Sequence, residues 1–364
     1  MFHPQGSYPW VVGLQGTLSL TVTSELDRRW RLGAQRRSLA NSGGPAYRVV
    51  EVPNVGRGMV AAKYIPQGCT VLTCEPILSF PETPMLRKVC YFCLARLKDN
   101  SQVDRAGRLF CSQHCAESAW RTFLQAETAA DTAHFSAHCL ETDDAMSLMA
   151  ARHVFSRLQN PHANPVQELG YLCRTDTGNY PAGKPKARWV RSFELLEESI
   201  VAAQTSRQNL PWRRNRGSKI RDWYFDAIKA IACNCFQVSY GANIMGVGVY
   251  INPAAVLSNK SGDILCNKIG TACFRTGSLI NHSCAPNVTF CFPCKDGTVR
   301  FVAKQDIPEG EPLSISYIHP SQPLSDRQAT LKRVYGFECT CQRCAEEWAF
   351  PSLGIHLDPD PAYC

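Results

Sequence analysis

The chain has 364 residues, of which 39 are basic, 31 acidic and 45% hydrophobic, so its net charge is +8. A normal apolar fraction with only 19% charged residues excludes a disordered polyelectrolyte and is sufficient for a buried core. No segment is long and apolar enough for a membrane span, and no secretory signal is evident. We therefore expect a nuclear or cytoplasmic protein whose 19 cysteines are thiols and metal ligands rather than disulfides.

The N-terminal part combines a basic extension with short predicted strands. The first 46 residues are rich in arginine, which predicts a weakly structured extension, with a transit peptide as the alternative. Alternating apolar and polar residues then predict strands, and Pro53–Gly58 predicts a turn between two of them. These strands are 47–52, 59–62 and 70–72. A cysteine cluster follows at 86–125.

Residues 126–229 are predicted to be mostly helical. Apolar residues recur at three- and four-residue spacing over 145–158 and 193–203, with a proline- and glycine-rich loop at 160–191. Strand signals return from residue 230, and a last helix is expected at 325–335. The later strands are 236–238, 247–250, 288–290, 299–302 and 313–317. Two strand-rich parts around a helical, cysteine-rich insertion predict an α+β fold without internal repeats.

Residues 184–221 form the most basic part of the chain. They contain ten basic residues against three glutamates, a net charge of +7. One interpretation is a solvated helical face. The other is a surface for an acidic partner, such as nucleic acid or an acidic protein tail.

The C-terminal cysteines have the spacing of metal ligands. Cys339, Cys341 and Cys344 form a C-x-C-x2-C pattern, three thiols within six residues. Because a structural zinc ion takes four ligands, a fourth has to come from elsewhere, and Cys284 is the candidate. The alternative is that these cysteines are unligated surface thiols.

Four motifs together resemble a SET domain with a post-SET zinc motif. They occur in the order of that family, span residues 47–344, and carry the resemblance by their combination. They are Gly56-Arg57-Gly58-Met59 with Ile65-Pro66-Gln67-Gly68, Asn281-His282-Ser283-Cys284, Ile315-Ser316-Tyr317, and Phe337 with the cysteines after it. The resemblance implies a mainly β SET fold and an S-adenosylmethionine-dependent protein-lysine N-methyltransferase that acts on a histone or another protein.

The insertion is similar to a MYND zinc finger of which half is missing. Its cysteines resemble the first and third metal pairs, and the second pair is absent. Phe123 and Glu127 stand where the fourth pair should begin. The resemblance implies one zinc ion here and two in the chain, unless the two cysteine pairs are unrelated. The expected ligands are Cys90, Cys93, Cys111 and Cys115 for one ion, and Cys284, Cys339, Cys341 and Cys344 for the other.

The chain therefore resembles the SET-and-MYND family, specifically the branch with an insertion before the Asn-His-Ser-Cys motif, here Ile251–Phe274, and no long helical C-terminal domain. The segments implied are a basic extension at 1–46, the N-terminal SET part at 47–85, a partial finger at 86–125, a helical insertion with a basic loop at 126–229, the SET core at 230–318, the post-SET segment at 319–348 and a tail at 349–364.

The resemblance also implies the roles of single residues. Tyr317 would line the channel for the substrate lysine beside the transferring methyl group, and Phe337 would stack on the adenine of the cofactor. The glycine turn would lie near the methionine end of the cofactor, where side chains would obstruct. The expected cofactor-binding residues are Gly56, Arg57, Gly58, Asn234, Asn281, His282, Tyr317 and Phe337.

Some features leave alternatives open. Arg57 beside the cofactor and the halved finger allow a catalytically inactive SET protein that serves as a zinc-dependent interaction module. His134, His138 and Cys139 offer a weak second metal site, and Tyr171 with Asn179 a weak cofactor contact. Cys291 and Cys294 are expected to be bystander thiols rather than a redox pair.

Overall fold

The computed structural model describes residues 44–52, 56–99, 101–160, 169, 172, 187–206, 217–240 and 268–350. The chain divides into two compact units, Met1–Pro45 and Ala46–Cys364, and the fold set out below is that of the second. Predictions for the basic extension, the strand at 247–250, most of the insertion at 251–274, the C-terminal tail, and Tyr171 with Asn179 lie outside the described residues.

The strands are short and form several small sheets. They are β1 (Tyr47–Val52), β2 (Gly56–Ala61), β3 (Thr70–Cys74), β4 (Leu78–Pro81), β5 (Gln102–Val103), β6 (Leu109–Phe110), β7 (Cys235–Ser239), β8 (Lys268–Cys273), β9 (Asn281–His282), β10 (Val288–Cys291), β11 (Val299–Ala303) and β12 (Ser314–Ile315). The sheet orders are β1-β2, β10-β11-β3, β12-β9, β4-β8-β7 and β5-β6. All described pairings are antiparallel except that of β12 with β9.

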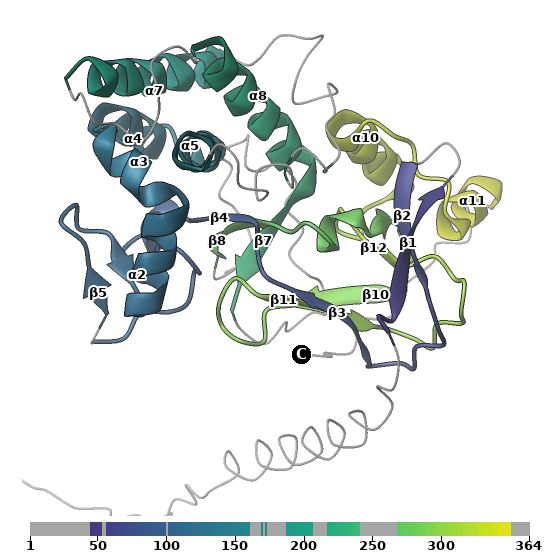
Figure 1. Ribbon diagram of the computed structural model, residues 1–364. Coiled ribbons are helices and arrows are strands. Elements are labelled where there is room, and N and C mark those ends of the chain that lie inside the picture. Colours follow the sequence, from purple (N-terminus) through teal and green to yellow (C-terminus); the bar gives the residue numbers. More distant parts are fainter. Residues whose placement is uncertain are drawn as a thin grey trace, which may run out of the picture. The chain divides into compact units, whose positions relative to one another are not determined.

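Two of these sheets join strands from both sides of the insertion. β3 pairs with β11, where Leu72 lies opposite Phe301, and β4 pairs with β8, where Phe80 lies opposite Thr271 (Figure 1). β-branched and aromatic residues favour these strands and bury one continuous apolar region. At its centre the Phe236 ring makes edge-on contacts with three other aromatic rings. The two strand-rich parts expected from the sequence therefore share one core.

Two expected strand boundaries were wrong. Arg57 and its flanking glycines were expected in a turn, yet they begin β2, with Arg57 opposite Glu51 of β1. The strand expected at 313–317 shortens to β12. The reason is that the amide of Tyr317 donates to a histidine ring nitrogen instead of a neighbouring strand.

The helices confirm the helical insertion and add one at the C-terminal end. They are η1 (Thr83–Met85), α2 (Gln113–Ala119), η2 (Trp120–Leu124), α3 (Gln125–Ala129), α4 (Ala133–Glu141), α5 (Ala145–Gln159), α7 (Ala187–Ser206), α8 (Gly217–Asn234), η4 (Gly277–Leu279), α10 (Leu324–Tyr335) and α11 (Gln342–Ala349). The strand expected at 236–238 is β7, and α8 reaches to Asn234 directly before it, with Ala230 and Ile231 buried in the helical core. The cysteine-rich end, for which no helix was expected, contains α11. No described helix combines the length and hydropathy needed to cross a membrane.

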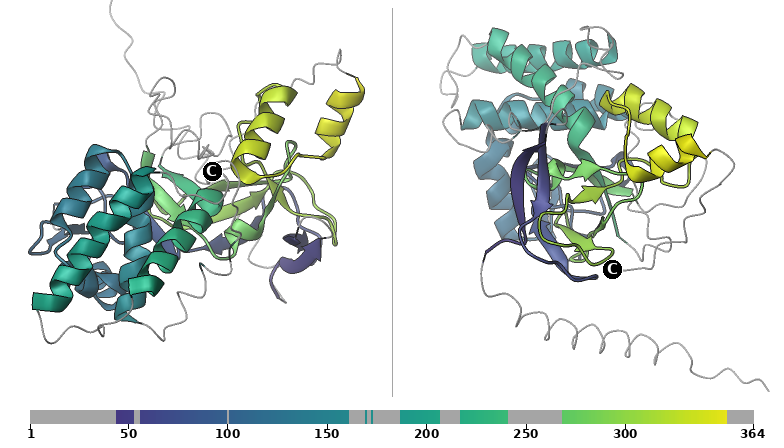
Figure 2. Two further views of the ribbon diagram at one scale, coloured as in Figure 1. Left: turned by 90° about the horizontal axis from the view of Figure 1, so that it is seen from above. Right: turned by 90° about the vertical axis from the view of Figure 1, so that its right-hand side faces the viewer.

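Buried residues form three clusters. The helices of the insertion pack on one another and on β4, and the sheets enclose a second cluster. The third is small and lies where α10 and α11 meet the end of the strands (Figure 2). It contains Cys284, Cys339 and Cys344, with Tyr317 and Phe337 packed against it. Metal-ligand candidates and the predicted catalytic tyrosine therefore share one small core.

Candidate active site and metal centres

The first cysteine group lies in the predicted partial finger. Its four Sγ atoms, all within 4.8 Å of one another, are those of Cys90, Cys93, Cys111 and Cys115. Leu94, with left-handed backbone at φ +67°, closes the turn between the first two cysteines. Ser112 caps α2 by accepting from the amide of Cys115 at 3.2 Å, which fixes the last cysteine on the first helical turn. The predicted tetrad is therefore brought together by local structure.

An ionic and aromatic cluster occupies the place of the missing half of the finger. Glu127 Oε1 accepts hydrogen bonds from the Tyr91 hydroxyl and from Arg108, both at 2.9 Å. The guanidinium of Arg152 lies 4.3 Å from the centre of the Tyr91 ring and 4.4 Å from that of Phe123. Burial and the neighbouring carboxylate raise the pKa of Tyr91 to about 12. Within the described residues, no group of metal-ligating side chains occurs here.

The second cysteine group joins distant parts of the chain. Its members, again with all Sγ atoms within 4.8 Å of one another, are Cys284, Cys339, Cys341 and Cys344. Cys284 Sγ lies 3.5 Å from Cys344 Sγ and 3.9 Å from Cys339 Sγ. Gly336 ends α10 with φ +81°, a conformation that favours glycine, and turns the chain back toward Cys284. The predicted fourth ligand is therefore at the predicted position.

Two buried arginines surround this second group. Arg327 is 1% exposed and donates to Glu347 at 2.6 Å, while its Nη2 lies 3.9 Å from Cys344 Sγ. Arg343 donates to Glu347 at 2.7 Å and to the carbonyl of Cys284 at 3.2 Å. Burial alone would raise the pKa of Glu347, but these two guanidinium groups hold it below its ordinary value. This arginine clamp of Arg327, Glu347 and Arg343 was not anticipated from the sequence.

Tyr317 is held at both ends. Its hydroxyl donates to the carbonyl of Ile280 at 2.8 Å, and its amide donates to His282 Nδ1 at 2.9 Å. A ring nitrogen that accepts an amide proton is itself unprotonated, so in the neutral imidazole Nε2 carries the hydrogen. That nitrogen lies 3.4 Å from Cys284 Sγ. Burial lowers the pKa of His282 to about 4, consistent with a neutral ring.

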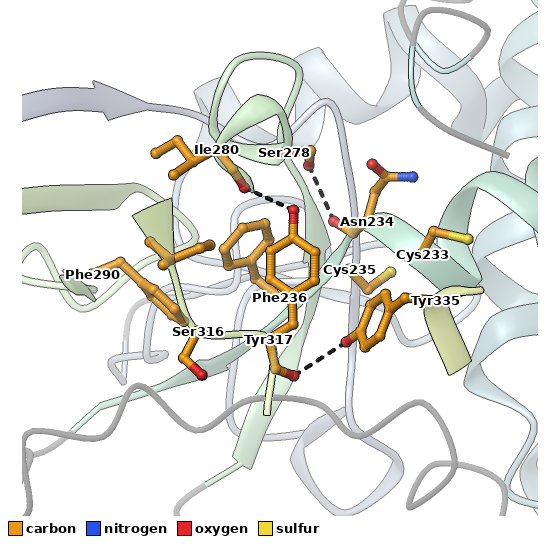
Figure 3. Close-up of a pocket in the computed structure, with 11 residues that line it drawn as sticks. Cys233, Asn234, Cys235, Phe236, Ser278, Ile280, Phe290, Ser316, Tyr317 and Tyr335 are labelled. Atoms are coloured by element: carbon orange, nitrogen blue, oxygen red, sulfur yellow. Dashed lines mark hydrogen bonds between the residues drawn. The ribbon is translucent and has the colours of Figure 1, made fainter. Parts of the chain in front are cut away.

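A small apolar cavity, here termed the Tyr317 pocket, lies beside this tyrosine. It has a volume of about 30 Å³, which is roughly the share of one water molecule in the liquid. Its aromatic and aliphatic walls are Phe236, Phe290, Ile280, Ile315, Tyr317 and Tyr335 (Figure 3).

Tyr335 forms the second phenolic wall. Its ring centre lies 5.0 Å from that of Tyr317, and its hydroxyl donates to the carbonyl of Tyr317 at 3.3 Å. Burial raises the pKa of Tyr335 well above its ordinary value, so the phenol is neutral. Sequence reasoning missed this residue, although its place two residues before Phe337 was an available signal.

The glycine segment contacts Asn281. A Cβ at Gly58 would lie 2.5 Å from Asn281 Nδ2 and 3.1 Å from Val52 Cγ2, so a side chain there would displace its neighbours. Asn281 Nδ2 also donates to the carbonyl of Arg57 at 3.3 Å. Gly56 is exposed with open space around it, and its φ of +89° is the reason for glycine at that position.

The remaining predicted cofactor residues, Asn234 and Phe337, both lie close to Tyr317. Asn234 is buried at the end of α8, lines the Tyr317 pocket, and donates to the carbonyl of Ala230 at 2.7 Å. The Phe337 ring lies 5.9 Å from His282 and 6.5 Å from Tyr317. Tyr317, which lines the pocket, therefore contacts both His282 and Phe337.

The structure also bears on the predictions for Cys291 with Cys294 and for the alternative metal site. Cys291 is disulfide-bonded, so the expectation that it is a thiol, and that the cysteines form no disulfides, was wrong at this position, while Cys294 is an exposed free thiol. The two residues are therefore not a redox pair with each other. Among the described residues, the metal-ligating groups do not include His134, His138 or Cys139, so that alternative site is not formed.

The described part of the basic segment is engaged with its own helices. Arg221 lies over the rings of Phe193 and Phe225 at 5.4 and 5.0 Å. Arg191 pairs with Glu194 at 3.2 Å. The densest run of arginines, at 207–216, lies outside the described residues.

Comparison with known proteins places this geometry in a family. The SET domain family matches residues 56–318, most of the chain. The chain belongs to the SET domain family. Its predicted fold class is thereby confirmed. Its predicted resemblance to SET-and-MYND proteins is confirmed by a protein of that name from Dictyostelium discoideum, which is 20% identical over 286 residues and covers 75% of this chain and 76% of that protein.

Individual relatives agree with this. The chain is 25% identical over 316 residues to the histone-lysine N-methyltransferase ATXR4 of Arabidopsis thaliana, covering 83% of this chain and 87% of that protein. It is 25% identical over 318 residues to the N-lysine methyltransferase SMYD2-A of Xenopus laevis, covering 85% and 63%. A solved SET domain of LSMT bound to lysine and AdoHcy is 13% identical, with 88% of this chain and 58% of that chain covered and a TM-score of 0.36. The names of these curated relatives agree with the predicted lysine methyltransferase activity.

Proposed function

We propose that the chain is an S-adenosylmethionine-dependent protein-lysine N-methyltransferase whose reaction takes place in the Tyr317 pocket. The observation that carries the proposal is this cavity of about 30 Å³, which has two tyrosines in its walls. It adjoins the predicted cofactor residues on one side and the post-SET cysteines on the other. A lysine side chain has an apolar stem and a cationic tip, and a cavity of this size with aromatic walls suits the tip of that side chain.

The pocket walls favour the reactive form of the substrate. A lysine amine has an ordinary pKa of about 10.4 and has to lose its proton before it attacks a methyl group. Apolar walls disfavour the ammonium form and lower this pKa. Because Tyr335 stays neutral, it places no negative charge in the pocket that would oppose this effect.

Tyr317 positions the amine. Its hydroxyl and its amide are both held by hydrogen bonds, so the ring has a fixed direction toward the cavity. An in-line displacement depends mainly on such fixed positioning of the reacting groups. We assign Tyr317 this positioning role together with the electrostatic effect of its hydroxyl.

When bound, S-adenosylmethionine supplies a methyl group on a sulfonium. The residues present fit it in three respects: Gly56 leaves open space beside the backbone, Asn234 lines the Tyr317 pocket, and Phe337 offers a ring for the adenine. The imidazole of His282 is used to hold Tyr317, so its backbone is the part assigned to the cofactor. Arg57, Gly58 and Asn281 complete the proposed set.

We assign one zinc ion to each cysteine tetrad, two in all. Four thiol sulfurs within reach of one tetrahedral ion are a typical structural zinc site. The cluster around Glu127 fills the remaining half of the finger without a metal-ligating group among the described residues. Elemental analysis of purified protein is expected to give two zinc ions per chain, and three would contradict this assignment.

The segments assigned from the sequence are part of the proposal. The SET domain is divided into 47–85 and 230–318, with the finger at 86–125, the helical insertion at 126–229 and the post-SET segment at 319–348. The substrate is a protein lysine, and a histone is the first choice because ATXR4 is named a histone-lysine methyltransferase. Nuclear or cytoplasmic residence follows from this substrate class.

Residues 184–221 stay a proposed surface for an acidic partner such as nucleic acid. The support is the net charge of +7 in the sequence, since the described Arg191 and Arg221 contact side chains of their own helices. Binding of duplex DNA that weakens steeply with salt would support this surface, and binding without salt dependence would exclude it.

The decisive experiment is isothermal titration of zinc-replete protein with S-adenosylhomocysteine, followed by methyl transfer to a histone mixture. We expect micromolar binding that Asn281→Ala abolishes and Tyr317→Phe retains. Tyr317→Phe is expected to lower methyl transfer at least tenfold, because positioning and the hydroxyl are both affected.

A folded protein that binds no S-adenosylhomocysteine would contradict the proposal. The inactive SET protein would then be the better interpretation. The partial finger and the basic segment would be the places to search for its function.

A further inference from the structure

Two thiols at the edge of the Tyr317 pocket face each other across neighbouring strands. Cys235 on β7 is the register partner of Cys273 on β8, and their Sγ atoms lie 3.2 Å apart. Cys235 lines the pocket, and Cys273 is fully buried behind it. Neither belongs to a cysteine tetrad, and neither has a role in the proposed methyl transfer.

Cys235 also lies next to the second tyrosine of the pocket. Figure 3 shows its side chain beside the ring of Tyr335. Charge on Cys235 would raise the pKa of Tyr335, in addition to the larger effect of burial, which agrees with this proximity. A change in the position of the Cys235 sulfur would therefore affect the packing of Tyr335, which is a wall of the pocket.

We propose that Cys235 and Cys273 are a modification site at which a hydroperoxide forms a reversible disulfide, and that this disulfide lowers methyl transfer. The expected loss of methyl transfer rests on the proposed methyltransferase function. Formation of the disulfide depends only on the two thiols.

The reaction balances in two steps. The sulfur of Cys235 attacks hydrogen peroxide, an S–O bond forms as the O–O bond breaks, and the products are a sulfenic acid and water. The sulfur of Cys273 then attacks the sulfenic sulfur, an S–S bond replaces the S–O bond, and a second water leaves. The two thiols lose two electrons and two protons, and the peroxide is reduced to two waters. A dithiol reverses the reaction and is itself oxidised to a disulfide.

The strand geometry permits this bond without separating the strands. Directly opposed residues of an antiparallel pair have Cα atoms about 4.5 to 5.5 Å apart, within the range of about 4.4 to 6.8 Å found for disulfides. The sulfurs have to approach from 3.2 Å to about 2.05 Å, a movement of about 1 Å. Misplacement of about 1 Å near reacting groups can lower a rate by roughly a hundredfold.

The Tyr317 pocket determines both how hydrogen peroxide reaches Cys235 and how fast this thiol is oxidised. Two thiols line this cavity, Cys233 and Cys235, and a peroxide that reaches it meets both. Cys235 has Cys273 Sγ at 3.2 Å, whereas Cys233 Sγ donates to the carbonyl of Lys229, so Cys235 is the thiol placed to form the disulfide. Burial raises the pKa of Cys235, so little thiolate is present and the reaction is slow. The pair would therefore respond to sustained rather than brief oxidation, and a ligand that fills the pocket would protect it.

The test is peptide mapping by mass spectrometry of full-length, zinc-replete protein treated with hydrogen peroxide and alkylated without reduction. We expect a cross-linked peptide pair joining Cys235 to Cys273, at least a tenfold loss of methyl transfer, and recovery of both with dithiothreitol. Cys273→Ala should keep its activity under the same treatment. Cys294→Ser removes an exposed thiol that has no role in the pair, so it should respond like the unmodified protein.

Three outcomes would overturn the proposal. One is absence of the cross-linked peptide pair after other cysteines have oxidised. Another is that peroxide lowers the activity of Cys273→Ala as much as that of the unmodified protein. Zinc release, recorded at the same time by a colorimetric chelator, would then assign the loss to the cysteine tetrads. The third is a complete cross-link with unchanged methyl transfer.

If Cys273→Ala does not fold, Cys273→Ser replaces it, and Cys235→Ala checks the cross-link alone. The cross-link needs no activity, so failure of reduced protein to bind S-adenosylhomocysteine would identify a failure of the proposed function instead.

Discussion

The two cysteine tetrads contain the same four thiols and differ in how the chain assembles them. The finger tetrad comes from Cys90 to Cys115, joined by a turn, a hairpin and one capped helix. The post-SET tetrad joins Cys284 to the segment from Cys339 to Cys344, more than 50 residues later. One is local, and the other ties two distant segments together.

Their surroundings differ in the same way. The finger tetrad adjoins the cluster of Glu127, Arg108 and Arg152, which packs on the insertion and has no contact with the predicted active residues among those described. The post-SET tetrad shares its small core with Tyr317 and Phe337. We infer that metal at the first site stabilises a module, whereas metal at the second shapes the active site.

The strongest test of this contrast is one ligand substitution at each site. Cys341→Ser should weaken binding of S-adenosylhomocysteine at least tenfold and lower the unfolding temperature, because the segment after Phe337 loses its anchor. Cys93→Ser should lower the unfolding temperature with cofactor affinity within twofold of the starting protein. Titration calorimetry with thermal unfolding measures both. Equal cofactor affinity in a folded Cys341→Ser variant would refute the contrast.

The finger can also be tested without touching a cysteine. Glu127→Ala leaves the Tyr91 hydroxyl without the carboxylate that accepts its proton, and leaves Arg108 with Asp104 as its remaining carboxylate. A buried polar group left without its partner costs about 1 to 3 kcal/mol. We expect a loss of about 2 kcal/mol in the free energy of unfolding, measured with denaturant, with normal cofactor binding. Glu117→Ala is the control, because its partner Arg121 is 69% exposed. A loss of similar size in this control would indicate a general effect of removing an acid.

A smaller effect is expected from the arginine clamp. Arg327→Met removes the positive charge 3.9 Å from Cys344 Sγ, and substitutions in the outer shell of a metal site commonly cost about 10- to 100-fold in metal affinity. We expect chelator-driven release of one zinc ion to become at least tenfold faster, with release from the finger unchanged. Arg327→Lys should restore part of the retention because it keeps the charge. Arg333→Met, on the exposed side of α10, is the control.

Motif spacing was the most reliable guide to the site. Both cysteine groups were predicted from their spacing and from the family resemblance, and the structure brings the members of each together. The contacts of Gly58 with Asn281 and of Tyr317 with His282 were not predicted, because the resemblance assigned these residues only to the surroundings of the cofactor.

Periodicity located α5 to within one residue at either end, but α7 begins at Ala187, inside the segment 160–191 that was expected to be a loop. α8 runs to Asn234, past the expected end of the helical insertion at 229, because Ala230 and Ile231 are buried against other helices.

The parts that were missed consist of contacts between distant residues. Tyr335, the arginine clamp, the Glu127 cluster and the Cys235–Cys273 pair each join segments separated by many residues or by an entire element. A single sequence contains no record of such pairings, because they depend on how complete elements pack.

The sequence by itself determined which chemistry is available: two sets of thiols at ligand spacing, a tyrosine after a short strand, and glycines where side chains would obstruct. These follow from covalent spacing and the conformational limits of each residue, which act over a few positions. The tertiary structure decided which of these groups lie next to one another. Packing of α10 and α11 against the strands placed one tetrad beside Tyr317 and closed an aromatic pocket with Tyr335. Pairing of β7 with β8 brought the sulfur of Cys235 to 3.2 Å from that of Cys273.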